Sequence, residues 1–124
     1  MSCRGGRAGR LVVRRNGKPK TVQEQIDRMV KRIVKKFRPE RVILFGSQAR
    51  GDAGPDSDVD LLVVLDFEGS AFEKAVEIRE ALHHILFPKD IIVTTPAAFA
   101  WRKEVVGTIE WPASREGKVV YARP

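Results

Sequence analysis

The 124-residue sequence contains one cysteine, Cys3, and few aromatic residues. A single cysteine excludes an internal disulfide framework and a cysteine-based zinc site, because either needs several such residues. Long apolar runs are also missing. The run at 59–65 is among the longest, whereas about 20 apolar residues are needed to cross a bilayer, and no apolar segment of signal-peptide length follows the basic N-terminus. We therefore expect a cytoplasmic protein without membrane contact.

Acidic residues are absent from residues 1–20, which carry seven of the 23 Lys and Arg residues. The formal charge of the chain is +7, so the remainder, from residue 21 onward, carries equal numbers of acidic and basic residues. A charge block of this kind is usually disordered. The sequence predicts a basic, flexible arm over 1–20, the only part expected to contact nucleic acid, and one domain with a single core over 21–124.

Apolar periodicity and capping signals divide the remainder into helices and strands. Each predicted helix begins at a capping signal, for example Thr21 followed by Glu24, whose side chains satisfy free backbone N–H groups. Short apolar runs bounded by turn residues predict buried strands. The predicted order is helix 21–37, strand 42–45, strand 59–65, helix 70–88, strand 91–95, helix 96–106 and strand 118–121.

Asp58 and Asp60 form an Asp-x-Asp at the start of the predicted strand 59–65. Residues two apart point to the same side of a strand, so both carboxylates are expected to converge. Carboxylates this close raise each other's pKa unless cations neutralise them. They suit Mg²⁺, which is typically held by one or two carboxylates and by substrate phosphates. The pair also fits a polar strand end at which both acids face water, so the motif alone leaves both possibilities open.

Gly46 and Ser47 follow the predicted strand 42–45, and a turn of helix is expected through Arg50. Glycine permits close approach of a ligand to the backbone, free N–H groups at a helix start attract anions, and the serine hydroxyl supplies one more donor. The pattern favours a phosphate cradle. It is neither a P-loop nor a dinucleotide fingerprint, whose further glycine and lysine positions are absent. Gly-Ser alone also occurs in ordinary strand-to-helix turns.

The two motifs together carry a resemblance. Residues 46–53, Gly-Ser-Gln-Ala-Arg-Gly-Asp-Ala, and 56–63, Asp-Ser-Asp-Val-Asp-Leu-Leu-Val, resemble the signature of the polymerase-β-like nucleotidyltransferase superfamily, and within it the small MNT (minimal nucleotidyltransferase) group. Asp90 matches the third carboxylate of that group, and 116–121 resembles its closing strand. The resemblance runs from about Val42 to the end. It implies an α/β (α+β) fold with a small mixed β-sheet flanked by helices.

The resemblance also implies Mg-dependent nucleotidyl transfer from ATP. Asp58 and Asp60 would bridge two Mg²⁺ ions, the arrangement in which paired metals stabilise the attacking and leaving oxygens. Asp90 would complete the metal next to the acceptor hydroxyl and help to remove its proton. All three carboxylates are therefore expected as catalytic residues and metal ligands.

The nucleotide itself would be held by the Gly-Ser turn. Gly46 and Ser47 would bind the β- and γ-phosphates, so that pyrophosphate leaves in line with the attack. Arg50 would add positive charge next to the triphosphate, although an exposed arginine in a loop is often simply solvated. Catalysis of this kind depends on positioning and electrostatics, and no covalent nucleophile from the protein is required.

MNT proteins that resemble this chain are typically paired with a HEPN-domain toxin that cleaves RNA. The resemblance implies an antitoxin that transfers AMP to a tyrosine hydroxyl of that partner, within a hetero-oligomer or a homodimer. Two alternatives stay open. One is a nucleotidyltransferase that acts on RNA or on a small-molecule hydroxyl, and the other is a non-catalytic antitoxin that neutralises its partner by binding.

Two further features have simpler explanations. The basic face of the first predicted helix is expected to be solvated, although an acidic partner could dock there. Adjacent residues on a helix point about 100° apart, so His83 and His84 are not expected to share one metal ion and are assigned a structural or surface role.

Overall fold

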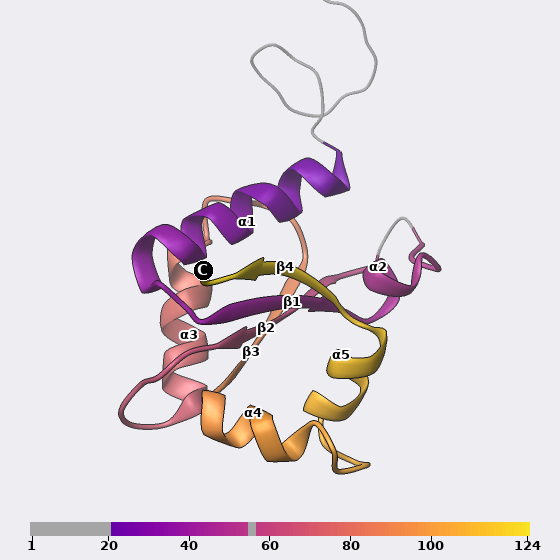
Figure 1. The fold of residues 1–124 in the computed structure, drawn as a ribbon. Coiled ribbons are helices and arrows are strands. Elements are labelled where there is room, and N and C mark those ends of the chain that lie inside the picture. Colours follow the sequence, from indigo (N-terminus) through magenta and orange to yellow (C-terminus); the bar gives the residue numbers. More distant parts are fainter. Residues whose placement is uncertain (1–20, 55–56) are drawn as a thin grey trace, which may run out of the picture.

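The computed structural model describes residues 21–54 and 57–124. The predicted basic arm, including Cys3, lies outside the described residues. The described chain forms a four-stranded mixed sheet with two helices on each face and a short helix at one end (Figure 1). The elements are α1 (Val22–Phe37), β1 (Arg41–Phe45), α2 (Ser47–Arg50), β2 (Val59–Val64), α3 (Ala71–Ala81), β3 (Lys89–Thr94), α4 (Pro96–Arg102), α5 (Glu110–Glu116) and β4 (Lys118–Ala122).

The strand order is β3-β2-β1-β4. β1 is antiparallel to β2 and to β4, whereas β2 and β3 are parallel. Phe45, the last residue of β1, pairs with Asp60 near the start of β2, and Asp60 pairs with Asp90 near the start of β3. The carboxyl end of β1 therefore meets the amino ends of β2 and β3 at one end of the sheet. The predicted mixed sheet flanked by helices is confirmed.

Helix α1 is defined at both ends by the residues that the sequence indicates. The Thr21 hydroxyl accepts from the Glu24 N–H (3.1 Å) and the Glu24 carboxylate accepts from the Thr21 N–H (2.8 Å), which completes a capping box. The helix ends at Phe37 because Arg38 adopts a left-handed conformation, with φ of 51°, before Pro39. The apolar stripe of α1 then packs on the sheet.

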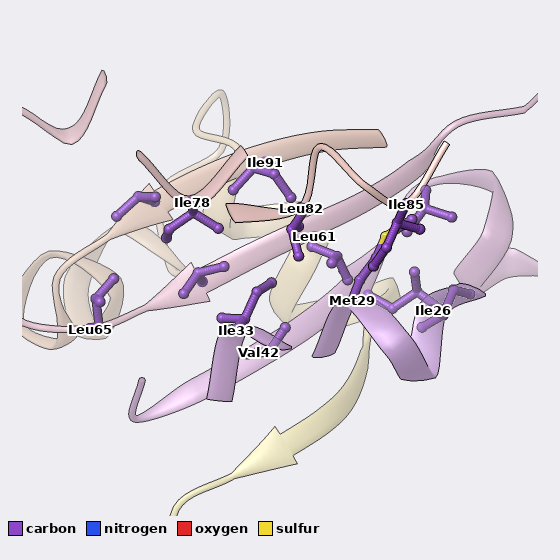
Figure 2. Close-up of a cluster of buried hydrophobic side chains, with 14 of the residues drawn as sticks. Ile26, Met29, Ile33, Val42, Leu61, Leu65, Ile78, Leu82, Ile85 and Ile91 are labelled. Atoms are coloured by element: carbon purple, nitrogen blue, oxygen red, sulfur yellow. The ribbon is translucent and has the colours of Figure 1, made fainter. Parts of the chain in front are cut away.

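The main core lies between the sheet and the helices α1 and α3 (Figure 2). Met29 and Ile33 from α1 and Ile78 from α3 are fully buried against Leu61 and Val63 of β2. A second cluster covers the opposite face, where Leu62 and Val64 pack with Phe99 of α4 and Ala113 of α5. Both faces of β2 are covered, which explains the unbroken apolar run from Leu61 to Leu65.

Two predicted helices end earlier than expected, and one helix is not predicted. α3 ends at Ala81 instead of continuing to Pro88, and α4 ends at Arg102 instead of Val106. α5 is absent from the predicted order. Leu82 and Ile85 follow α3 in a turn yet remain buried, so the apolar spacing continues after the helix has stopped. Pro112 lies in the first turn of α5, where no backbone N–H is required.

The strand boundaries agree more closely with the sequence prediction. β3 begins two residues before the predicted strand 91–95, which places Asp90 inside the strand rather than before it. The other strands occupy the predicted segments to within one residue. Among the described helices, none combines the length and the apolar character that a membrane span requires.

Candidate active site

Gly46 joins β1 to α2 and lies directly against the carboxylate of Asp60. Its φ of +75° belongs to the left-handed region that favours glycine. A Cβ atom built on Gly46 would overlap the Asp60 Oδ2 atom. Only glycine fits here, because both the backbone angle and the space exclude a side chain. The predicted glycine turn is thus in contact with the predicted carboxylate motif.

The α2 turn presents backbone and hydroxyl donors beside this contact. The Ala49 and Arg50 N–H groups both donate to the Gly46 carbonyl (3.1 Å each) and close the turn. The Ser47 side chain is half-buried, and within residues 21–54 and 57–124 its hydroxyl has no hydrogen-bond partner. The Gln48 side chain donates to the Ser57 carbonyl (3.2 Å) and so ties the turn to the segment that precedes Asp58.

The three predicted carboxylates lie at the same end of the sheet. Asp60 and Asp90 are paired on the neighbouring parallel strands β2 and β3. Asp58 directly precedes β2 and lies two residues before Asp60, and residues two apart point to the same side of an extended chain. Asp58 is exposed, whereas Asp60 and Asp90 are half-buried. The sequence motif therefore becomes a cluster in space, with Asp90 supplied by a strand some thirty residues away.

The electrostatics of Asp60 reflect this crowding. Its pKa is raised above the ordinary aspartate value, first by burial and then by the negative charges of Asp90 and Asp58, while Arg50 acts in the opposite direction. The ionised form of Asp60 is thus held at a free-energy cost in the protein alone. A cation placed between these carboxylates would remove that cost.

Arg79 is a member of the cluster that the sequence did not indicate as functional. Its Nη2 atom lies 3.1 Å from Asp90 Oδ1, and both side chains are about half exposed. Arg79 comes from the last turn of α3, which packs beside β3. The apolar spacing of that helix carries no information about this pairing, because the pairing depends on how α3 lies against the sheet.

Arg50 is held at the edge of the site by two carboxylates. Its guanidinium lies 3.2 Å from Asp52 and 3.6 Å from Glu116, at the end of α5. The neighbouring carboxylates raise the pKa of Arg50 above its usual value, Asp52 most strongly. Arg50 also acts on the charge of Asp60, so its positive charge reaches the carboxylate cluster from this position.

The donor set fits Mg²⁺ together with a nucleotide. Mg²⁺ is typically bound by one or two carboxylates and by substrate phosphates, and the free N–H groups at the start of a helix attract such phosphates. In the part of the chain that the structure describes, no three Asp, Glu, His or Cys side chains are grouped closely enough to hold a metal ion by themselves. An ion held at the predicted ligands Asp58, Asp60 and Asp90 would therefore need substrate phosphates to complete its coordination.

A comparison with protein families identifies the fold. The model of the nucleotidyltransferase domain family matches residues 26–112, which is well over half of the chain and includes the Gly-Ser turn and all three carboxylates. A protein of Methanocaldococcus jannaschii, named as a proposed protein adenylyltransferase, is 37% identical over 79 residues, which span 60% of this chain and 79% of that protein.

Solved structures share the architecture. A nucleotidyltransferase of Sulfolobus solfataricus superimposes with a TM-score of 0.55 at 23% identity, over 81% of this chain and 79% of that one. A toxin–antitoxin complex with AMP-PNP gives a TM-score of 0.52 at 18% identity, over 83% and 75%. Identities this low show the fold alone. Together with the family match, they establish that this chain belongs to the nucleotidyltransferase domain family and is a nucleotidyltransferase of the polymerase-β-like fold.

Proposed function

We propose that this chain transfers the adenylyl group of ATP to a tyrosine hydroxyl of a partner HEPN toxin and so acts as its antitoxin. The observation that carries the transferase chemistry is the contact between Gly46 and the Asp60 carboxylate, with Asp90 paired to Asp60 on the adjacent strand. It brings the Gly-Ser turn and the carboxylate cluster to one end of the sheet. A nucleotide held at that turn would have its phosphates next to the carboxylates.

Each residue of the site would have a separate role in the transfer. Gly46 and Ser47 would bind the β- and γ-phosphates through the backbone and the Ser47 hydroxyl. Asp58 and Asp60 would hold Mg²⁺, which when bound neutralises the charge that develops on the phosphates. The tyrosine oxygen forms a bond to the α-phosphorus while the bond from that phosphorus to the bridging oxygen breaks, and pyrophosphate leaves. The carboxylate of Asp90 would accept the hydroxyl proton.

The comparisons support a protein as the acceptor. The Methanocaldococcus relative is named as a protein adenylyltransferase, and it is 37% identical in the matched segment. The similar toxin–antitoxin structure contains AMP-PNP, an ATP analogue. ATP as the nucleotide and a toxin as the partner are the simplest assignments that agree with both.

The test is an incubation with ATP labelled at the α-phosphate, Mg²⁺ and the protein encoded beside this chain. We expect label on a tyrosine of that protein and none without Mg²⁺. Asp58→Asn combined with Asp60→Asn should lower the transfer by about a hundredfold or more, whereas Asp66→Asn with Glu68→Gln, an equal loss of charge on exposed residues beyond the other end of β2, should leave it unchanged.

The same variants separate transfer from binding alone. If the partner is neutralised equally well by the Asp58→Asn and Asp60→Asn protein, neutralisation depends on contact and the enzymatic proposal is wrong. Transfer of label to RNA or to a small molecule, with none to the partner, would also contradict it.

A further inference from the structure

The segment between α3 and β3 forms an exposed turn that the proposed chemistry does not use. Its backbone is closed by hydrogen bonds from the Ile85 N–H to the Leu82 carbonyl (2.9 Å) and from the Phe87 N–H to the Ile85 carbonyl (2.9 Å). Leu82 and Ile85 are buried and anchor the turn to the core, whereas Leu86 is 93% exposed. The turn therefore presents an apolar side chain to solvent from a fixed backbone.

Basic side chains lie around this turn; one of them donates to the end of α3 just before it, and another donates to the turn itself. The Arg32 Nε atom donates to the Ala81 carbonyl (3.3 Å) at the end of α3. The Lys89 Nζ atom donates to the carbonyls of Ile85 (2.7 Å) and Phe87 (2.9 Å). We call this group, with the exposed leucine, the docking surface; it consists of Arg28, Arg32, His83, His84, Leu86 and Lys89.

The field of the docking surface is positive. The pKa of His84 is lowered below its ordinary value, first by desolvation and then by four basic neighbours, Arg32, Arg28, His83 and Lys89. Each charged group that acts on His84 is basic. Such a concentration of one sign attracts anionic groups and orients their approach.

The docking surface adjoins the active site. The Val59 N–H donates to the Pro88 carbonyl (3.0 Å), and Val59 stands between Asp58 and Asp60. Lys89 is followed directly by Asp90, which pairs with Asp60. A ligand bound at the turn would therefore lie next to the carboxylate cluster.

We propose that the docking surface binds an acidic segment of the acceptor protein and so brings its tyrosine to the carboxylate cluster. This inference rests on the proposed function and adds the chemistry of its substrate. The segment would carry Asp and Glu side chains that face the basic residues, and an apolar side chain that packs on Leu86.

Leu86 favours a protein over a nucleic acid as the ligand. Protein interfaces combine apolar and polar side chains, and Leu86 is exposed between Ile85 and Phe87, whose carbonyls accept hydrogen bonds from Lys89. Single-stranded RNA is recognised by stacking on aromatic side chains, whereas Phe87, the aromatic residue of this turn, packs against the core. Binding to the phosphates of a nucleic acid depends on positive charge, to which an exposed leucine contributes nothing.

The test measures binding without ATP, by fluorescence anisotropy. The probe is a fluorescein-labelled random copolymer of glutamate and tyrosine, and the comparison ligands are polyglutamate and polyuridylic acid. We expect the wild-type chain to bind the tyrosine-containing copolymer most tightly, and Arg28→Glu with Arg32→Glu to weaken this binding by about tenfold. Leu86→Ser should weaken it by about threefold and leave the binding of polyglutamate unchanged.

The matched control is Lys35→Glu with Lys36→Glu. These exposed residues lie on the same helix α1 and their substitution reverses the same amount of charge, but neither acts on His84. Their variant should bind the copolymer within about twofold of wild type. If replacing Arg32 prevents folding, Arg28→Gln compared with Lys35→Gln tests the same point, because each substitution removes one positive charge from α1.

Three results would overturn the proposal. They are equal losses in the docking and control variants, tighter binding of polyuridylic acid than of the copolymer, and copolymer binding that is insensitive to Leu86→Ser. The outcome is independent of catalysis, because ATP is omitted. A chain that binds the copolymer as expected but transfers no label contradicts the proposed function alone, whereas transfer without docking contradicts this inference alone.

Discussion

Glycine is required at position 46 for two separate reasons, its backbone conformation and its contact with Asp60. The left-handed φ of Gly46 restricts the position to glycine on conformational grounds, and the overlap that a Cβ would make with Asp60 restricts it again on steric grounds. The two effects can be measured separately, because Gly51 ends α2 with a similar φ of +84°, and a Cβ added there would meet nothing within 4 Å. Gly51 thus serves as an internal reference for the effect of a left-handed backbone without a steric overlap.

Gly46→Ala should lower both stability and transfer. We expect Gly51→Ala to reduce the free energy of unfolding by about 1 kcal/mol from the left-handed backbone alone, and Gly46→Ala to reduce it by about 2 to 4 kcal/mol because Asp60 must also move. Urea unfolding of the two variants measures the difference. Transfer should fall by about a hundredfold in Gly46→Ala alone. Equal effects at both positions would show that the overlap with Asp60 is relieved without consequence.

Asp60→Asn should stabilise the metal-free protein while abolishing transfer. The folded pKa of Asp60 is raised, so its charged form opposes folding, and this penalty develops as the pH rises from below about 4, the ordinary aspartate value, through the folded pKa. At neutral pH we expect a gain of about 1 kcal/mol, or about 4 to 8 °C in Tm. The gain should shrink at low pH and when Mg²⁺ and ATP are added. Thermal unfolding of the Asp66→Asn control should show no such gain, and a gain in that control would assign the effect to net charge.

At the scale of elements, α3 does more than cover the sheet. Its last turn places Arg79 on Asp90, and the turn that follows it places Lys89 and the docking surface beside β2. β3 itself holds Asp90 in register with Asp60. One helix, one turn and one strand therefore determine the charge around Asp90.

Arg79→Gln should affect metal binding more than stability. The Arg79–Asp90 pair is half exposed, and exposed ion pairs contribute about 0 to 1 kcal/mol. Removing the competing cation should lower the Mg²⁺ concentration for half-maximal transfer by about threefold to tenfold. Lys74→Gln is the control, because Lys74 lies on the same helix in an ion pair with Glu77 (2.9 Å). A parallel change in both variants would assign the effect to the overall charge of the chain.

The elements also show what the sequence can and cannot predict. The Asp-x-Asp and the Gly-Ser turn are contiguous, so their residue types are sufficient to indicate a site. The partnership of Arg79 and Asp90 is not predictable, because it depends on packing between two elements. The predicted end of α3 is wrong because Leu82 and Ile85 continue to face the core after the helix stops. α5 is not predicted because a proline usually ends a helix, whereas Pro112 lies in the first turn of α5, where proline is tolerated.

For the molecule as a whole, the decisive feature is a sheet that is covered on both faces. Leu61 faces α1 and α3, and Leu62 faces α4 and α5; both are fully buried. The same α4 and α5 face carries Asp60, so packing there supports the site directly. The Glu116–Arg50 pair adds a link from the end of α5 to α2.

Substitutions in the two clusters test this architecture. Leu61→Ala and Leu62→Ala should each reduce the free energy of unfolding by about 3 kcal/mol, since each leaves a cavity in a closed cluster. Val119→Ala, at a residue that is 56% exposed, should change it by less than about 0.5 kcal/mol. Chemical denaturation measures all three. A small effect of Leu62→Ala alone would mean that α4 and α5 cover the sheet only loosely.

The position of β3 at the edge of the described sheet has a consequence for how the reaction is protected from water. Asp90 lies on this outermost strand and is half exposed, and Asp58 is exposed as well. The proposed reacting centre therefore lies at the edge of the described sheet, where a bulky acceptor can reach it from the side. An acceptor that binds at this edge would displace water from the α-phosphorus. Binding of the acceptor would therefore permit transfer and at the same time slow the hydrolysis of ATP.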